Sequence, residues 1–85
     1  MKQFSYVLTH ANGLHVRLNS GLAREASRFK SAISIYKGER AALLSDVKAV
    51  SGLGVRCGDM IRITVEGIDE EAAVAAIQQY FVLNL

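Results

Sequence analysis

The sequence has very few residues that could build a covalent or metal-bound scaffold. Its single cysteine, Cys57, cannot form a disulfide within the chain. No cluster of His, Cys, Asp or Glu residues has the spacing of metal ligands, so we expect no metal site and no cofactor. A small domain without disulfides is typical of a reducing cytosol.

Long apolar runs and a strong charge of one sign are also absent. No stretch approaches the ~20 apolar residues that span a bilayer, and the first residues lack the apolar core of a signal peptide. We therefore expect a cytoplasmic protein without membrane insertion. The formal net charge of +2 is too small to indicate nucleic acid as a partner, and no basic stripe carries interleaved aromatic residues.

The residues that are present favour one folded domain over the whole range 1–85. Period-two alternation predicts strands at 2–8, 31–36, 40–44 and 61–66. Helical spacing predicts helices at 16–28, from 47 to the stop at Gly52, and at 69–83, the last with a buried stripe of Ala73, Ala76, Ile77 and Tyr80. Because the strands are amphipathic, we expect an α+β fold: a four-stranded, mainly antiparallel sheet with the first and last helices on one face.

The junction between the first strand and the first helix holds the strongest candidate for chemistry. His15 precedes the apolar stripe of the helix, and the amides of Val16, Arg17 and Leu18 have no acceptor within the helix if it begins there. Such amides bind anions. A neutral imidazole can attack phosphorus to give a phosphohistidine, and the guanidinium of Arg17 suits the resulting charge.

The residues alone leave a simpler interpretation open, because a single histidine near a helix start is more often an exposed residue or a cap. His10 lies in the preceding turn and is interpreted as a solvated loop residue. No paired carboxylates and no Ser-His-Asp or Cys-His arrangement accompany His15, which disfavours a catalytic triad.

Several motifs spread over nearly the whole chain carry a resemblance to a known family. They are Gly13-Leu14-His15-Val16-Arg17, Ala26-Ser27-Arg28-Phe29-Lys30-Ser31, Ser51-Gly52-Leu53-Gly54-Val55, Gly58-Asp59-Met60-Ile61-Arg62-Ile63 and Glu66-Gly67-Ile68-Asp69-Glu70-Glu71-Ala72. The sequence resembles the HPr family, the histidine phosphocarriers of the phosphoenolpyruvate:sugar phosphotransferase system. The resemblance implies an open-faced β-sandwich with the element order β-α-β-β-α-β-α.

The resemblance also implies a role for particular residues. His15 matches the phosphoryl acceptor, which receives phosphate from Enzyme I through Nδ1 and passes it to sugar-specific IIA domains. Arg17 matches the active-site arginine, and Val16, Arg17 and Leu18 would supply the phosphate-binding amides. Partner-binding positions are Arg24, Val47, Lys48 and Val50. We expect a monomeric carrier with a transient phosphohistidine rather than a turnover enzyme.

Two departures from the family pattern bear on function. Leu18 replaces the proline that usually follows the arginine, which restores an N–H. We expect its side chain simply to pack; the alternative is an altered phosphate cradle and an altered transfer rate. Asp46 replaces the serine that a kinase phosphorylates in many members; aspartate can cap the short helix but cannot be phosphorylated by that kinase. These changes keep an alternative open, a specialised or regulatory relative that acts by protein binding.

Overall fold

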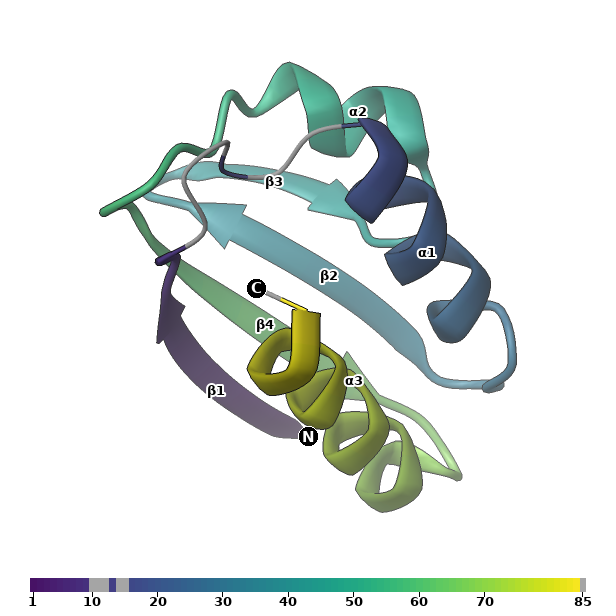
Figure 1. The fold of residues 1–85 in the computed structure, drawn as a ribbon. Helices are drawn as coiled ribbons and strands as arrows, with labels where there is room; N and C mark the ends of the chain where they lie inside the picture. Colours follow the sequence, from purple (N-terminus) through teal and green to yellow (C-terminus); the bar gives the residue numbers. More distant parts are fainter. Residues whose placement is uncertain (10–12, 14–15, 85) are drawn as a thin grey trace.

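The computed structural model describes residues 1–9, 13 and 16–84, and Figure 1 shows their arrangement. The element order is the predicted β-α-β-β-α-β-α. In chain order the elements are β1 (Lys2–Val7), α1 (Val16–Ala26), β2 (Ala32–Lys37), β3 (Arg40–Leu43), α2 (Val47–Gly52), β4 (Met60–Glu66) and α3 (Glu70–Asn84). None of the helices in these ranges is long and apolar enough to cross a membrane.

The four strands form one sheet in the order β1-β4-β2-β3, and every neighbouring pair is antiparallel. β4 is central because both of its edges are paired: Ile63 lies opposite Phe4 of β1 and opposite Ile35 of β2. β2 and β3 form a tight hairpin in which Lys37 lies opposite Arg40, and the turn between them uses Gly38 at φ 61°. The prediction of a four-stranded antiparallel sheet is confirmed.

One face of the sheet carries the hydrophobic core. The alternation of β4 places Ile61, Ile63 and Val65 in the core, each 1% exposed or less, and turns Arg62 to the other face. All three helices cover the core side, because Leu22 of α1, Val50 of α2 and Ile77 of α3 belong to the same buried cluster. The opposite side of the sheet carries no helix, so the molecule is an open-faced sandwich.

The last helix differs in detail from its prediction. Ala73 and Ile77 are buried as expected, but Ala76 and Tyr80 are only half-buried, and Phe81 is fully buried instead. The Phe81 ring lies edge-on to the ring of Phe4, with centroids 6.0 Å apart. The prediction missed Phe81 because apolar residues occur on nearly every side of α3, so spacing alone does not select one stripe.

Candidate functional site

The predicted site lies at the start of α1. The helix begins at Val16, and Arg17 and Leu18 continue its first turn, so their amides have no acceptors within the helix. The positive end of the helix dipole lies at the same point. His15 falls outside the described residues, as do the side chains of Val16 and Arg17. The described backbone thus places a helix N-terminus, where anions are favoured, directly after His15.

Gly13 fixes the chain just before α1 against a second segment. It is buried, with φ 63°, a conformation that favours glycine. A Cβ at this position would lie 2.5 Å from the carbonyl oxygen of Val55 and 2.7 Å from Cα of Arg56. Only glycine allows such an approach. No local pattern in the sequence reveals which backbone Gly13 contacts.

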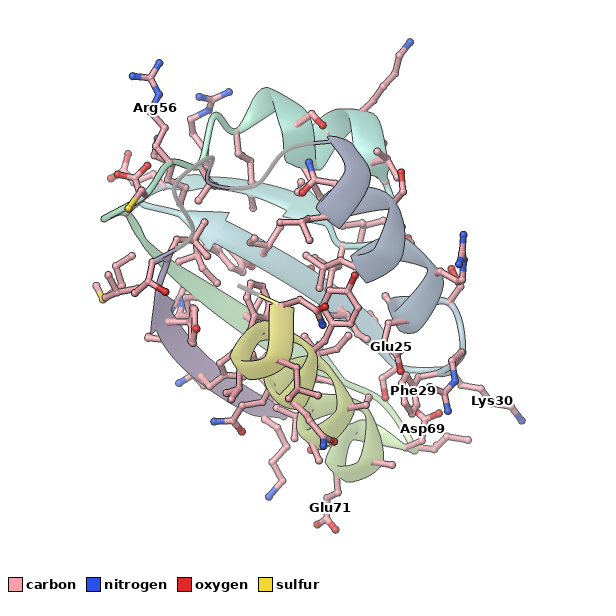
Figure 2. All side chains as sticks on the ribbon, viewed as in Figure 1. Glu25, Phe29, Lys30, Arg56, Asp69 and Glu71 are labelled. Atoms are coloured by element: carbon pink, nitrogen blue, oxygen red, sulfur yellow. The ribbon has the colours of Figure 1, made fainter. Side chains whose placement is uncertain are left out.

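The segment that Gly13 packs against, residues 54–59, is held by two charged side chains. The Lys37 ammonium donates to the carbonyl oxygen of Gly54 at 2.9 Å and lies 3.1 Å from Oδ2 of Asp59. The amide of Arg56 donates to the same oxygen at 2.9 Å. These contacts, the Arg56 amide first and Lys37 next, hold the pKa of Asp59 below its usual value. The Arg56 side chain itself is exposed and points away from the protein (Figure 2).

A partly buried hydrogen bond joins α1 to α2. Nδ2 of Asn19 donates to Oγ of Ser51 at 2.9 Å, and Asn19 is only 1% exposed. Its Oδ1 is buried and has no partner among the described residues. The sequence did not predict this bond. The spacing of Asn19 from Leu22 and Ala26 does place Asn19 on the buried stripe of α1.

The start of α2 follows the predicted capping. Asp46 has an extended backbone and its Oδ1 accepts from the amide of Ala49 at 3.1 Å, so the aspartate caps the short helix. Leu18, the other departure, is half-buried and packs against the core cluster. Neither substitution disturbs the fold of the helix that carries it.

The predicted partner-binding residues divide into two groups. Arg24 and Lys48 are exposed, and Val47 is half-buried, so these three are accessible to a partner. Val50 is 1% exposed and belongs to the core cluster. Its side chain is therefore unavailable to a partner, and the expectation that Val50 contacts one is corrected: Val50 instead anchors α2 on the sheet.

The chemistry offered by the rest of the described chain is limited. Within residues 1–9, 13 and 16–84, no group of three or more His, Cys, Asp or Glu side chains is placed to hold a metal ion. Cys57 is exposed and free.

Comparison with known proteins shows which family has this arrangement. The family model described as the PTS HPr component phosphorylation site matches residues 2–82. The chain belongs to the HPr family. It is 38% identical over 79 residues to phosphocarrier protein HPr of Mycoplasma capricolum, covering 93% of this chain and 89% of that protein. With phosphocarrier protein HPr of Mycoplasma genitalium it shares 41% identity over 80 residues, covering 92% and 90%.

A solved structure gives the same result for the HPr fold. The structure of the histidine-containing phosphocarrier protein of a Mycoplasma superimposes with a TM-score of 0.92 and 36% identity, over 95% of this chain and 92% of that one. The resemblance to the HPr family and the open-faced sandwich are therefore confirmed. The function that follows for the chain is that of a phosphocarrier of the phosphotransferase system.

Proposed function

We propose that this phosphocarrier takes its phosphoryl group on Nδ1 of His15, receives it from Enzyme I and passes it to IIA domains. The observation that carries this proposal is the start of α1 at Val16, the residue after His15. A phosphoryl group on that imidazole would lie beside the amides of Val16, Arg17 and Leu18, which have no acceptor within the helix. The family match to a phosphorylation site over residues 2–82 supports the same assignment.

The chemical step needs only a nucleophile and charge stabilisation. The lone pair of Nδ1 forms the N–P bond while the bond between phosphorus and its donor group breaks, and the donor keeps that electron pair. The helix terminus favours the anionic product, and the guanidinium of Arg17 supplies paired donors for its oxygens. Transfer to a IIA domain reverses these roles, with the imidazole as leaving group.

The partners dock, in this proposal, on the exposed parts of α1 and α2. Arg24 and Lys48 give this surface positive charge, and half-buried Val47 adds apolar area to it. Partners with acidic surfaces around their own phosphorylation sites would be favoured. The bond between Asn19 and Ser51 fixes the two helices relative to each other and so holds this composite surface together. The carrier acts as a cytoplasmic monomer.

Regulation through a phosphorylated serine at position 46 is not part of this function. Asp46 supplies a fixed negative charge and the helix cap at that position, and it is not a substrate for a serine kinase. A relative that acts by binding alone is not favoured, because the two Mycoplasma proteins that align with about nine-tenths of the chain are phosphocarriers.

The test is phosphorylation of the purified protein by Enzyme I and phosphoenolpyruvate. We expect acid-labile phosphate on the wild-type protein, none on His15→Ala, and slower labelling of Arg17→Ala. His10→Ala removes the other histidine of the chain and is the matched control, which should label normally. Labelling that survives in His15→Ala would refute the assignment of the acceptor.

A further inference from the structure

The face of the sheet opposite the helices has the features of a second binding surface. Strand alternation brings together on it the residues that do not face the core: Gln3, Ser5, Val7, Ala32, Ser34, Tyr36, Ala41, Leu43, Met60, Arg62, Thr64 and Glu66. Large apolar side chains are exposed there, with Val7 50%, Leu43 54% and Met60 64% accessible. We call this surface the open face.

Arg62 occupies the middle of the open face and has an unusual environment. It lies directly opposite Ser5 of β1 and opposite Tyr36 of β2, so the three side chains form one row across the sheet. Its guanidinium carbon lies 4.6 Å from the centre of the Tyr36 ring. Within the described part of the chain no carboxylate pairs with Arg62. The stacking holds the guanidinium in place and leaves its N–H groups free.

Arg28 provides an internal comparison. It also lies over an aromatic ring, 5.6 Å from the centre of Phe29, but its guanidinium is already paired with the carboxylate of Glu25. Arg62 likewise lies over an aromatic ring, that of Tyr36, but no described carboxylate pairs with it. A carboxylate beside Arg62 would complete the arrangement that Arg28, Phe29 and Glu25 already make.

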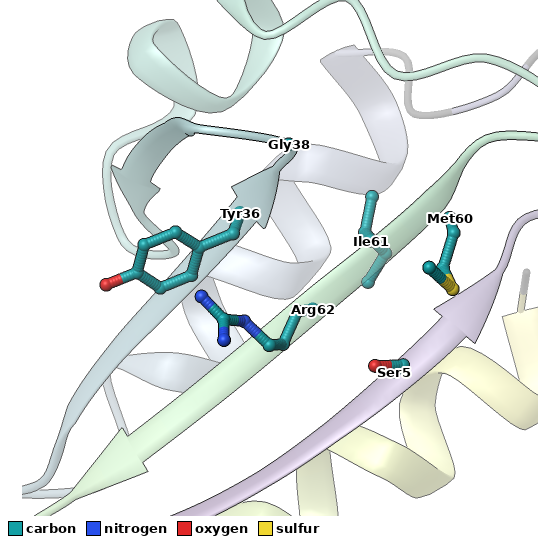
Figure 3. Close-up of a pocket in the computed structure, with 6 residues that line it drawn as sticks. All are labelled: Ser5, Tyr36, Gly38, Met60, Ile61 and Arg62. Carbon is teal, nitrogen blue, oxygen red and sulfur yellow. The ribbon is translucent and has the colours of Figure 1, made fainter.

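A shallow hollow surrounds this guanidinium, as Figure 3 shows. It has a volume of about 190 Å³ and is lined by Ser5, Tyr36, Gly38, Met60, Ile61 and Arg62. Sites for small organic ligands usually measure about 300–1,000 Å³, so this hollow suits a single side chain. Val7 lies opposite Met60 and extends the apolar border of the hollow onto β1.

We propose that the open face binds a protein segment that places an Asp or Glu carboxylate on Arg62 and a neighbouring apolar side chain on Val7 and Met60. The stacked guanidinium can pair with a carboxylate through two parallel hydrogen bonds. An exposed ion pair alone contributes little, so the adjacent apolar contact is needed for measurable affinity. Nucleic acid would require several cations on this face, and the open face offers one.

This surface is separate from the proposed phosphoryl site, because the helices that carry that site lie behind the sheet (Figure 3). Binding at the open face therefore leaves α1 and α2 accessible to other partners. The inference does not depend on the role proposed for His15.

The test uses a synthetic N-acetylated and C-amidated peptide, Ser-Leu-Glu-Leu-Ser, titrated into the full chain labelled with ¹⁵N. We expect amide shift changes confined to β1, β2 and β4 around Ser5, Tyr36 and Arg62, with a Kd in the millimolar range or below. The peptide Ser-Leu-Gln-Leu-Ser keeps the shape and loses the charge, and it should bind about tenfold more weakly.

Variants decide whether Arg62 is responsible. Arg62→Gln should weaken binding of the glutamate peptide about tenfold, and Tyr36→Leu should weaken it because the guanidinium loses its platform. Arg28→Gln is the matched control and should bind as the wild type does. The unfolding temperature of each variant shows that the sheet is intact. Equal binding of the two peptides, shifts confined to α1 and α2, or no shifts with millimolar peptide would each overturn the proposal.

Discussion

At the scale of single residues, the site depends on a glycine as much as on a histidine. Gly13 is held within van der Waals distance of the backbone at Val55 and Arg56, and this contact joins the chain before α1 to segment 54–59. Lys37 and Asp59 in turn fix that segment. The position of Gly13, three residues before α1, therefore rests on contacts between segments far apart in the sequence.

The close approach of Gly13 can be tested by comparing Gly13→Ala with the same substitution at a matched glycine, Gly38. Gly38 has nearly the same conformation, φ 61°, but a Cβ there would meet nothing within 4 Å. Gly38→Ala should therefore cost only the conformational penalty of about 1 kcal/mol in the free energy of unfolding. Gly13→Ala adds a clash with the Val55 carbonyl, so we expect a loss of about 2 kcal/mol or more.

Urea unfolding of the two variants measures this difference. Gly13→Ala should also label more slowly with Enzyme I, whereas Gly38→Ala should label normally. Equal losses of stability in the two variants would contradict the close approach.

At the scale of elements, two polar links join segments of the chain that flank or carry the helices. One is the bond between Asn19 of α1 and Ser51 of α2. The other is made by Asp69, just before α3, which accepts from the amides of Lys30 at 2.8 Å and Ser31 at 2.9 Å and from the Ser31 hydroxyl. The Asp69 link lies at the end of the molecule opposite Arg56 (Figure 2), far from the start of α1. It therefore stabilises the fold without contacting the candidate site.

The link between Asn19 and Ser51 predicts that the cost of Ser51→Ala depends on which residue occupies position 19. Ser51→Ala leaves the buried amide group of Asn19 without its acceptor, so we expect it to cost about 1 kcal/mol of unfolding free energy. In an Asn19→Leu background the amide is gone, and the same change should cost less than about 0.5 kcal/mol. Denaturant unfolding of the four proteins gives the coupling energy. Equal costs in both backgrounds would show that the bond contributes nothing.

The Asp69 link predicts a particular dependence of stability on pH. The Ser31 hydroxyl, followed by the Lys30 amide, lowers the pKa of Asp69 below its ordinary value of 3.8. A carboxylate with a lowered folded pKa contributes stability that is complete above 3.8 and is lost as the pH falls through the lower, folded value.

Asp69→Asn should therefore lower the unfolding temperature most at neutral pH, and the difference from wild type should shrink below pH 3.8. Glu66→Gln, at an exposed acid of β4, is the control and should leave the pH profile unchanged. Thermal unfolding across the acid range measures both. A constant difference between wild type and Asp69→Asn down to acid pH would contradict this account.

At the scale of the whole molecule, the sequence predicted what depends on neighbours along the chain and missed what depends on distant contacts. The element order and the start of α1 follow from periodicity and turn residues, and both agree with the structure. The burial of Phe81 did not follow, because only the docking of α3 against β1 selects its buried side.

In the candidate site, too, the sequence predicted the local features and missed those that depend on distant contacts. His15 and Arg17 stand out by residue type and position at a helix start, whereas the contact of Gly13 with Val55 and the burial of Val50 become visible only in the folded chain. Side-chain class reveals which groups can react. Packing between segments remote in sequence decides which residues position the reactive groups and which residues remain accessible.

The central claim is that the phosphoryl group resides on the imidazole of His15. The most direct measurement is NMR of the wild-type protein after reaction with Enzyme I and phosphoenolpyruvate, with ³¹P and ¹⁵N detection of the imidazole. We predict one phosphorus signal coupled to Nδ1 of His15, lost on mild acid treatment and absent from His15→Ala. A phosphorus signal on any other residue, or the same signal in His15→Ala, would contradict the account.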